Sequence, residues 1–144
     1  GLLVFRSFGK FFGLAGLRLG FVIGEAAVLD RIEDGLGPWA VSGPALTVAT
    51  TLMASDTSGI RRDIAQRKAA LDMALAAAGL AVAGGTGLFS LVDHAEAAAI
   101  HEGLCRHRIL VRPFDYDPRW LRFGLAPDAA SDARLAAALG EVMG

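Results

Sequence analysis

A glycine-rich segment with one lysine constrains the fold of this chain more than any other feature. Residues 7–20 read SFGKFFGLAGLRLG, and Lys10 lies among the glycines. Apolar runs at 2–5 and 19–23 flank the segment. Short apolar runs bounded by glycine are typical of strands in a sheet that is covered on both faces. The sequence therefore predicts two short buried strands on either side of a lysine loop.

The residue types in this loop suit a phosphorylated aldehyde. Lysine forms Schiff bases because its compact amine becomes a nucleophile when it loses its proton. Arg18 offers a planar guanidinium fork that matches phosphate oxygens, and Ser7 adds a hydroxyl donor. Glycines let the backbone approach a flat ligand closely. Lys10 is thus the candidate catalytic residue, and Ser7 and Arg18 are candidate phosphate ligands.

Other interpretations of the segment are weaker. A lone Ser-x-x-Lys is short and common, and it can be a buried turn with an exposed lysine and a structural arginine. In β-lactamases the serine of this motif opens a helix, whereas here an apolar strand-like run precedes Ser7. A P-loop needs Ser or Thr after Gly-Lys, and Phe11 stands there instead.

Residues 7–21 as a whole resemble the lysine signature of fold-type I pyridoxal-phosphate enzymes, the class I/II aminotransferase group. Three later stretches, GPWAVSGPA at 37–45, ILVRPF at 109–114 and WLRFGL at 120–125, resemble the threonine-phosphate decarboxylases of cobalamin biosynthesis. Those enzymes are relatives of the histidinol-phosphate aminotransferases. The resemblance implies pyridoxal 5'-phosphate as the cofactor. One departure is Gly9, because many relatives have a serine immediately before the lysine.

The resemblance also implies a fold class and a domain organisation. The expected class is α/β, with the end of a large-domain sheet followed by a small C-terminal α/β domain. Residues 1–24 would be the large-domain remnant with the Schiff-base lysine, 25–55 a connecting helical segment, and 56–144 the small domain. The implied complete enzyme is more than twice this long and forms a homodimer. Its ring-binding aspartate and first phosphate loop would lie before Gly1.

Two arginines are candidate substrate ligands. Arg122 lies among apolar residues, where a charge is costly unless it is paired or used. In the aminotransferase group an arginine at this motif binds the substrate α-carboxylate, and the resemblance carries that role to Arg122. From the residues alone, a structural ion pair with Asp115 or Asp117 is the alternative. Arg112 either faces the substrate entrance or is a solvent-exposed residue at the end of a strand.

The implied activity is decarboxylation of L-threonine O-3-phosphate to aminopropanol phosphate, a step of cobalamin biosynthesis. Which bond at the substrate Cα breaks depends on the site and not on the fold. A pyridoxal-phosphate aminotransferase of the histidinol-phosphate type is therefore the second hypothesis. A third is that the chain by itself is a non-catalytic module with part of a cofactor site.

Composition excludes several other classes of partner. The formal net charge of -1 gives no basic footprint for nucleic acid and no polybasic arm for a membrane. No stretch approaches the roughly 18 apolar residues of a membrane span. The single Cys105 fits a reducing cytoplasm. His94, His101 and His107 lack the further ligands of a metal spacing, so we expect no metal site. The family resemblance implies a small-molecule amino-acid substrate.

Periodicity predicts the remaining elements. Helices are expected at 26–34, 44–54, 60–78, 95–107 and 128–143, and strands at 80–83, 88–92, 109–112 and 120–124. The alternating charges of 61–72 are typical of a solvated helix face. Cys105 is expected as a packed thiol in the middle of a helix. The run GGTG at 84–87 favours a hairpin turn over a phosphate loop.

Overall fold

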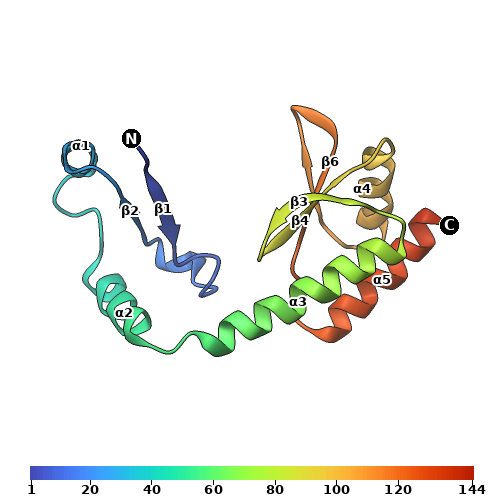
Figure 1. Cartoon of the computed structure of the whole chain (residues 1–144), viewed down its shortest axis with the longest axis horizontal. Helices are drawn as coiled ribbons and strands as arrows, with labels where there is room; N and C mark the ends of the chain where they lie inside the picture. Colours follow the sequence, from blue (N-terminus) through green and yellow to red (C-terminus); the bar gives the residue numbers. More distant parts are fainter. The chain divides into compact units, whose positions relative to one another are not determined.

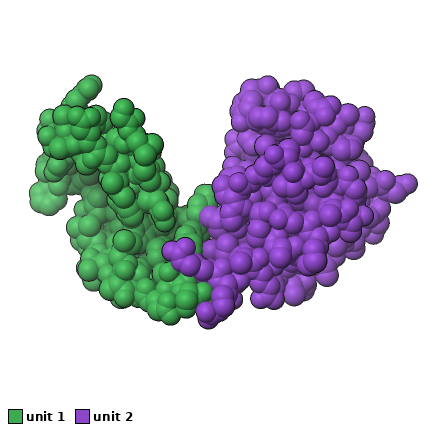
Figure 2. All heavy atoms as spheres, in the orientation of Figure 1, with its two compact units in different colours: residues 1–60 green, residues 61–144 purple.

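The computed structural model describes residues 1–144 and has a mixed α/β architecture (Figure 1). The chain divides into two compact units, Gly1–Ile60 and Arg61–Gly144, which Figure 2 draws in different colours. No helix in it is long and apolar enough to cross a membrane. The predicted α/β class is confirmed, and the division at 24 and 55 stays a prediction.

The first unit contains a strand pair, a 3-10 turn and two helices. They are β1 (Val4–Ser7), η1 (Ala15–Leu17), β2 (Gly20–Ile23), α1 (Ala26–Leu36) and α2 (Gly43–Ala54). Ser42 caps α2, because its Oγ accepts a hydrogen bond from Ala45 N at 3.3 Å. This bond satisfies one of the N–H groups that every helix start leaves unpaired.

The two strands of the first unit pair antiparallel, with Val4 opposite Ile23 and Ser7 opposite Gly20. Glycine is needed at position 20 because a Cβ there would lie 2.7 Å from the carbonyl oxygen of Arg6. The prediction that these strands are buried is wrong for this chain, since their side chains are mostly exposed. A two-stranded ribbon has no second layer of its own to cover its apolar side chains.

The second unit is a two-layer α/β domain. Its elements are α3 (Ser58–Ala77, which begins in the first unit), β3 (Val82–Thr86), β4 (Phe89–Asp93), α4 (Ala97–Arg106), β5 (Arg112–Phe114), β6 (Asp117–Gly124) and α5 (Ala129–Met143). The antiparallel sheet has the order β3-β4-β6-β5. Alternate residues of β4 and β6 form a buried core with all three helices, and its members include Val92, Leu121, Phe123, Leu75, Leu104 and Leu139.

Because strand residues alternate between faces, the same strands present a second set of side chains on the opposite face of the sheet. Phe89 and Leu91 of β4 and Trp120 and Arg122 of β6 are half-buried, and Arg112 of β5 is exposed. We call this surface the open face, because the core and its helices lie on the other side of the sheet. Both candidate substrate arginines belong to strands that form it.

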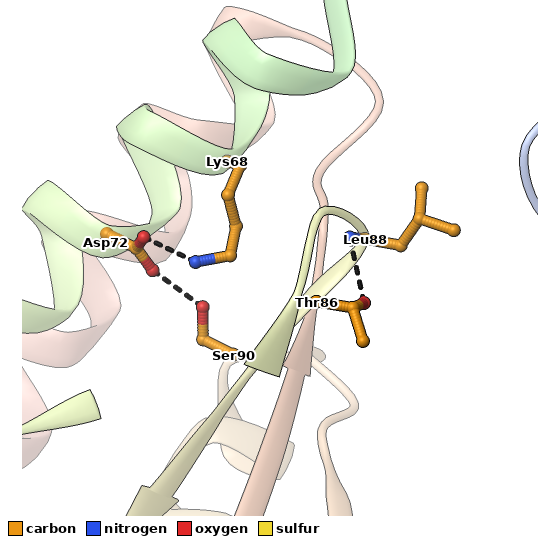
Figure 3. Close-up of polar contacts among 5 residues, drawn as sticks. All are labelled: Lys68, Asp72, Thr86, Leu88 and Ser90. Carbon is orange, nitrogen blue, oxygen red and sulfur yellow. Dashed lines mark hydrogen bonds and ion pairs between the residues drawn. The ribbon is translucent and has the colours of Figure 1, made fainter. Parts of the chain in front are cut away.

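A polar contact ties α3 to the core side of the sheet. The fully buried Ser90 donates its hydroxyl to Asp72 Oδ1 at 2.6 Å, and Asp72 Oδ2 pairs with Lys68 (Figure 3). Arg67 similarly pairs with Asp132 of α5. The prediction that 61–72 is a solvated face is therefore wrong for its second half, where these charges join helices and sheet.

Element boundaries differ most where the chain leaves a helix. Gly79, just after α3, has φ +73°, and the next residue, Leu80, donates its N–H back to Leu75 O at 2.9 Å. This bond completes the helix end, so β3 begins two residues later than expected. The predicted hairpin is present, but its turn lies further along the chain than 84–87. Residues 84–86 belong to β3, and Thr86 pairs with Phe89 across the two-residue turn Gly87–Leu88.

The packed thiol is a wrong prediction. Cys105 is exposed on α4, and its Sγ lies 3.6 Å from Nε2 of His101, one helical turn away. The apolar neighbour Leu104 faces the core instead. A run of apolar letters in a short helix does not by itself say which side of the helix is buried.

Candidate active site

A buried aromatic anchor holds the lysine loop, which we define as residues 7–20. Phe8 is 3% exposed, stacks on Phe12 with ring centroids 5.3 Å apart, and meets Phe21 edge-on at 6.2 Å. Its N–H donates to Leu19 O at 3.2 Å, and its carbonyl accepts from Leu14 N at 3.0 Å. Both ends of the loop are thereby fixed close to the lysine.

Lys10 follows this anchor at the exposed turn of the loop. Its carbonyl accepts a hydrogen bond from Gly13 N at 3.0 Å, and Gly13 has φ +69°, a conformation that favours glycine. The ε-amine has no hydrogen bond or ion pair with the rest of the chain. The amine of Lys10 is therefore accessible to a ligand.

Ser7 lies at the end of β1, and its hydroxyl keeps a donor available. Its Oγ accepts a hydrogen bond from Gly9 N at 3.0 Å, so its own O–H can still point to a ligand. A Cβ on Gly9 would lie 3.3 Å from that oxygen and 3.2 Å from the Cα of Ala15. Glycine therefore suits the tight loop at position 9.

Arg18 occupies an unusual backbone position at the other end of the loop. It has φ +51°, in the left-handed region, and follows η1 as its C-terminal cap. One guanidinium nitrogen, Nη1, donates to Ala15 O at 3.1 Å, which leaves other donors of the fork free. Arg18 also stands two residues before Gly20, which pairs with Ser7. The strand pair thus brings Ser7 and Arg18 to the same end of the ribbon.

The charge of this region suits an anion. Residues 1–24 contain Arg6, Lys10 and Arg18 and no acidic residue. An amine, a hydroxyl donor and a guanidinium fork, without a competing carboxylate, are the groups that a phosphorylated aldehyde requires. The residues present therefore fit the pyridoxal-phosphate group that the sequence resemblance implies.

The second unit brings the two other predicted residues together. Arg112 of β5 and Arg122 of β6 are register partners, so they lie directly opposite each other across neighbouring strands. We call them the arginine pair. Like charges in directly opposite positions are destabilising in an antiparallel sheet. A bound anion would relieve this repulsion, which makes the arginine pair a candidate anion site.

No acidic side chain neutralises Arg122, so the alternative of an ion pair with Asp115 or Asp117 is wrong. Asp117 Oδ1 instead accepts a hydrogen bond from the backbone N of Arg119 at 3.0 Å. The guanidinium carbon of Arg122 lies 5.0 Å from the ring centroid of Phe89, a cation–π distance. Phe89 is thus a residue of the site that the sequence motifs did not indicate.

The structure groups the predicted residues in two sets. Ser7, Lys10 and Arg18 share the lysine loop of the first unit, and the arginine pair belongs to the second. In the first set Ser7 ends β1, and Lys10 and Arg18 lie in the loop between β1 and β2. In the second set the two arginines occupy directly opposite positions of paired strands.

Comparison with known proteins identifies the class. Residues 1–139 match the family model for aminotransferase class I and II. The chain therefore belongs to the class I and II aminotransferase family, as its lysine segment indicates.

Individual relatives are more specific. The chain is 62% identical over 141 residues to a threonine-phosphate decarboxylase of a Sinorhizobium species and 43% identical over 149 residues to one of Pseudomonas aeruginosa. These alignments cover 98% and 96% of the chain but 42% of each relative. Histidinol-phosphate aminotransferase 1 of Thiobacillus denitrificans is 35% identical, with 99% of the chain and 38% of the relative aligned. The chain thus spans about two fifths of these relatives' length.

Solved structures agree on the fold. A putative aminotransferase from Burkholderia pseudomallei is 30% identical with a TM-score of 0.79, and the alignment covers 99% of this chain and 45% of that structure. Histidinol-phosphate aminotransferase from Sinorhizobium meliloti, solved in complex with pyridoxal-5'-phosphate, is 30% identical with a TM-score of 0.73, over 98% of this chain and 40% of that structure.

Proposed function

We propose that the complete protein containing this chain is a pyridoxal-phosphate enzyme that decarboxylates L-threonine O-3-phosphate to aminopropanol phosphate in cobalamin biosynthesis. The observation that carries this proposal is the 62% identity to a threonine-phosphate decarboxylase over 98% of the chain, against 35% to a histidinol-phosphate aminotransferase. The geometry of the lysine loop and of the arginine pair supplies a role for each candidate residue.

The lysine loop holds the cofactor in this proposal. Lys10 would hold the cofactor through Nζ at its aldehyde carbon, with release of water, and Ser7 and Arg18 would hold the cofactor phosphate. When bound, the cofactor ring accepts the electron pair that Cα releases, a chemistry that no side chain provides. Glycines at 9 and 13 let the loop backbone lie close to a flat ring.

The arginine pair holds the substrate. L-Threonine O-3-phosphate carries a carboxylate and a phosphate, and both match the guanidinium fork. Arg122 binds the α-carboxylate and fixes the direction of the bond that breaks. Arg112, directly opposite, is available for the second anionic group. Because the substrate amine would replace Lys10 on the cofactor, the freed amine of Lys10 would be available to return a proton to Cα after CO₂ leaves.

An aminotransferase of the histidinol-phosphate type is the second candidate, because relatives of that name align over nearly the whole chain. In that reaction Lys10 would remove a proton from Cα in place of the loss of CO₂. A third possibility concerns the 144 residues alone, which are expected to be inactive if groups outside them complete the site. We further propose that the complete protein is a cytoplasmic homodimer.

A product assay tests the proposed reaction. The complete protein is loaded with pyridoxal phosphate and given L-threonine O-3-phosphate, and the products are identified by mass. We expect CO₂ and aminopropanol phosphate, with no requirement for a keto acid. A keto-acid product that depends on 2-oxoglutarate would contradict the decarboxylase and favour the aminotransferase.

A further inference from the structure

Four residues of the neighbouring strands that share a face of the sheet with Arg122 explain how it is held. Leu91 lies directly opposite it on β4, and Arg112 lies directly opposite it on β5. The two diagonal neighbours on β4 are Phe89 and Asp93, because neighbours two positions along a strand share a face. Only Asp93 among these four could neutralise a guanidinium.

That acid is already engaged elsewhere. Asp93 Oδ1 accepts a hydrogen bond from Nε of Arg119 at 2.7 Å, and Nη2 of Arg119 lies 2.6 Å from the same oxygen. This leaves Phe89 as the group on which the guanidinium of Arg122 rests, at 5.0 Å from the ring centroid. The opposite residue on β6, Gly124, has no side chain that could displace the ring.

We propose that Phe89 is a positioning residue for the substrate anion, which holds the Arg122 guanidinium through a cation–π contact without neutralising it. This inference rests on the proposed function, in which Arg122 binds the substrate carboxylate. It adds a residue of β4 that the lysine and arginine motifs do not include.

The choice of an aromatic ring over an acid has a physical reason. A carboxylate partner would bind the guanidinium tightly and would compete with the substrate for the same donors. A ring face attracts the cation through its quadrupole but accepts no hydrogen bond in the plane of the fork. The five N–H donors therefore stay available, while the long side chain loses rotamers before the substrate arrives.

The test uses the complete protein with cofactor and compares Phe89→Leu, Phe89→Tyr and Phe89→Met. Phe89→Leu keeps an apolar residue but removes the ring face, and Phe89→Met replaces the ring with a flexible apolar chain if the leucine variant does not fold. Phe89→Tyr keeps the ring. The dissociation constant for L-threonine O-3-phosphate is read from the change in cofactor absorbance, which does not depend on which product forms.

We expect Phe89→Leu and Phe89→Met to weaken substrate binding by about three- to tenfold, and Phe89→Tyr to stay within about twofold of the parent. The same substitutions are then made beside Arg122→Gln. If Phe89 acts through Arg122, removing the ring adds little further loss in that background. Unchanged binding in Phe89→Leu, or an equal loss with and without Arg122, would overturn the inference.

The outcome is separable from the proposed reaction. The product formed by the parent protein tests decarboxylation and is the same whatever Phe89 does. If the parent turns over histidinol phosphate instead, its phosphate takes the place of the carboxylate as the anion at Arg122, and the same variants and the same double-mutant comparison are measured with that substrate. A loss that is confined to the ringless variants and vanishes beside Arg122→Gln supports the positioning role with either substrate.

Discussion

Two arginines of this chain adopt the left-handed backbone conformation that usually belongs to glycine. Arg18 has φ +51° and Arg108 has φ +57°. An L-residue in this region costs about 1–2 kcal/mol relative to the ordinary helical region. Strain of this kind persists where the surrounding structure or the function requires the side chain. Arg18 has such a reason in the proposed phosphate contact, whereas Arg108 follows α4 at a position where glycine is common.

The two positions give a matched pair of variants. We expect Arg18→Gly to keep or raise the stability of the complete protein by up to about 1 kcal/mol, while its affinity for pyridoxal phosphate falls by about tenfold or more. Arg108→Gly should bring a similar gain in stability with unchanged cofactor affinity. Thermal unfolding and cofactor titration measure both quantities. Equal cofactor affinity in the two variants would remove Arg18 from the site.

At the scale of elements, a polar contact joins α3 to β4. It reaches β4 from the core side of the sheet, and Phe89 lies on the opposite face of the same strand. Asp72 accepts hydrogen bonds from Lys68 and from the buried hydroxyl of Ser90 (Figure 3). These two bonds, with Lys68 the larger influence, hold the pKa of the Asp72 carboxyl below its ordinary value of 3.8. The ionised form is therefore favoured in the folded protein.

This shift predicts how stability depends on pH. Because the pKa is lowered on folding, the stabilisation is fully present above the unfolded value of 3.8 and is lost as the pH falls through the lower folded value. Asp72→Asn should cost at most about 1 kcal/mol at neutral pH, since the carboxylate is partly solvated and screened. The difference from the parent should disappear at acid pH.

Asp63→Asn is the control for this experiment. Asp63 lies on the same helix, is exposed, and has no hydrogen bond or ion pair. Denaturant unfolding between pH 7 and pH 3 compares the three proteins. A cost for Asp72→Asn that persists undiminished at the lowest pH would contradict the role of the ionised carboxylate.

Much of the element pattern could be predicted from the sequence because it depends on local signals. The helix expected at 26–34 runs over Ala26–Leu36, and the one expected at 60–78 runs over Ser58–Ala77. Strand ends were less predictable, since Leu80 and Ile109 are drawn back to the preceding helix ends by hydrogen bonds to Leu75 O and Leu104 O. Such capping is settled by backbone geometry more than by apolar pattern.

The residues of the candidate site also differ in how far the sequence could predict them. Ser7, Lys10 and Arg18 are close in sequence, so one motif indicated all three. The position of Arg112 opposite Arg122 depends on strand register, and the contact of Phe89 with Arg122 joins strands separated by a helix and a further strand. A single sequence contains no local signal for that register. The alternation of apolar residues at Phe89 and Leu91 indicates only that these two side chains share one face of their strand.

At the scale of the whole molecule, the two units differ in how much apolar surface they cover. The second unit has a core shared by all its helices and its sheet. The first unit exposes large apolar side chains on its strands and loops, among them Leu2 (77% exposed), Phe5 (71%) and Trp39 (92%). Extensive exposed apolar surface marks a face that contacts other protein. The lysine loop belongs to this less covered unit, so its chemistry is best tested in the complete protein.

The central claim is that Lys10 is the cofactor lysine, and covalent trapping tests it most directly. The complete protein with pyridoxal phosphate is reduced with borohydride and digested with trypsin. Trypsin cleaves after unmodified lysine and arginine, so an adduct at Lys10 should appear as one uncleaved peptide over residues 7–18. That peptide contains Ser7, Lys10 and Arg18 together. An adduct on Lys68, the other lysine of this chain, or no adduct on residues 7–18, would contradict the account.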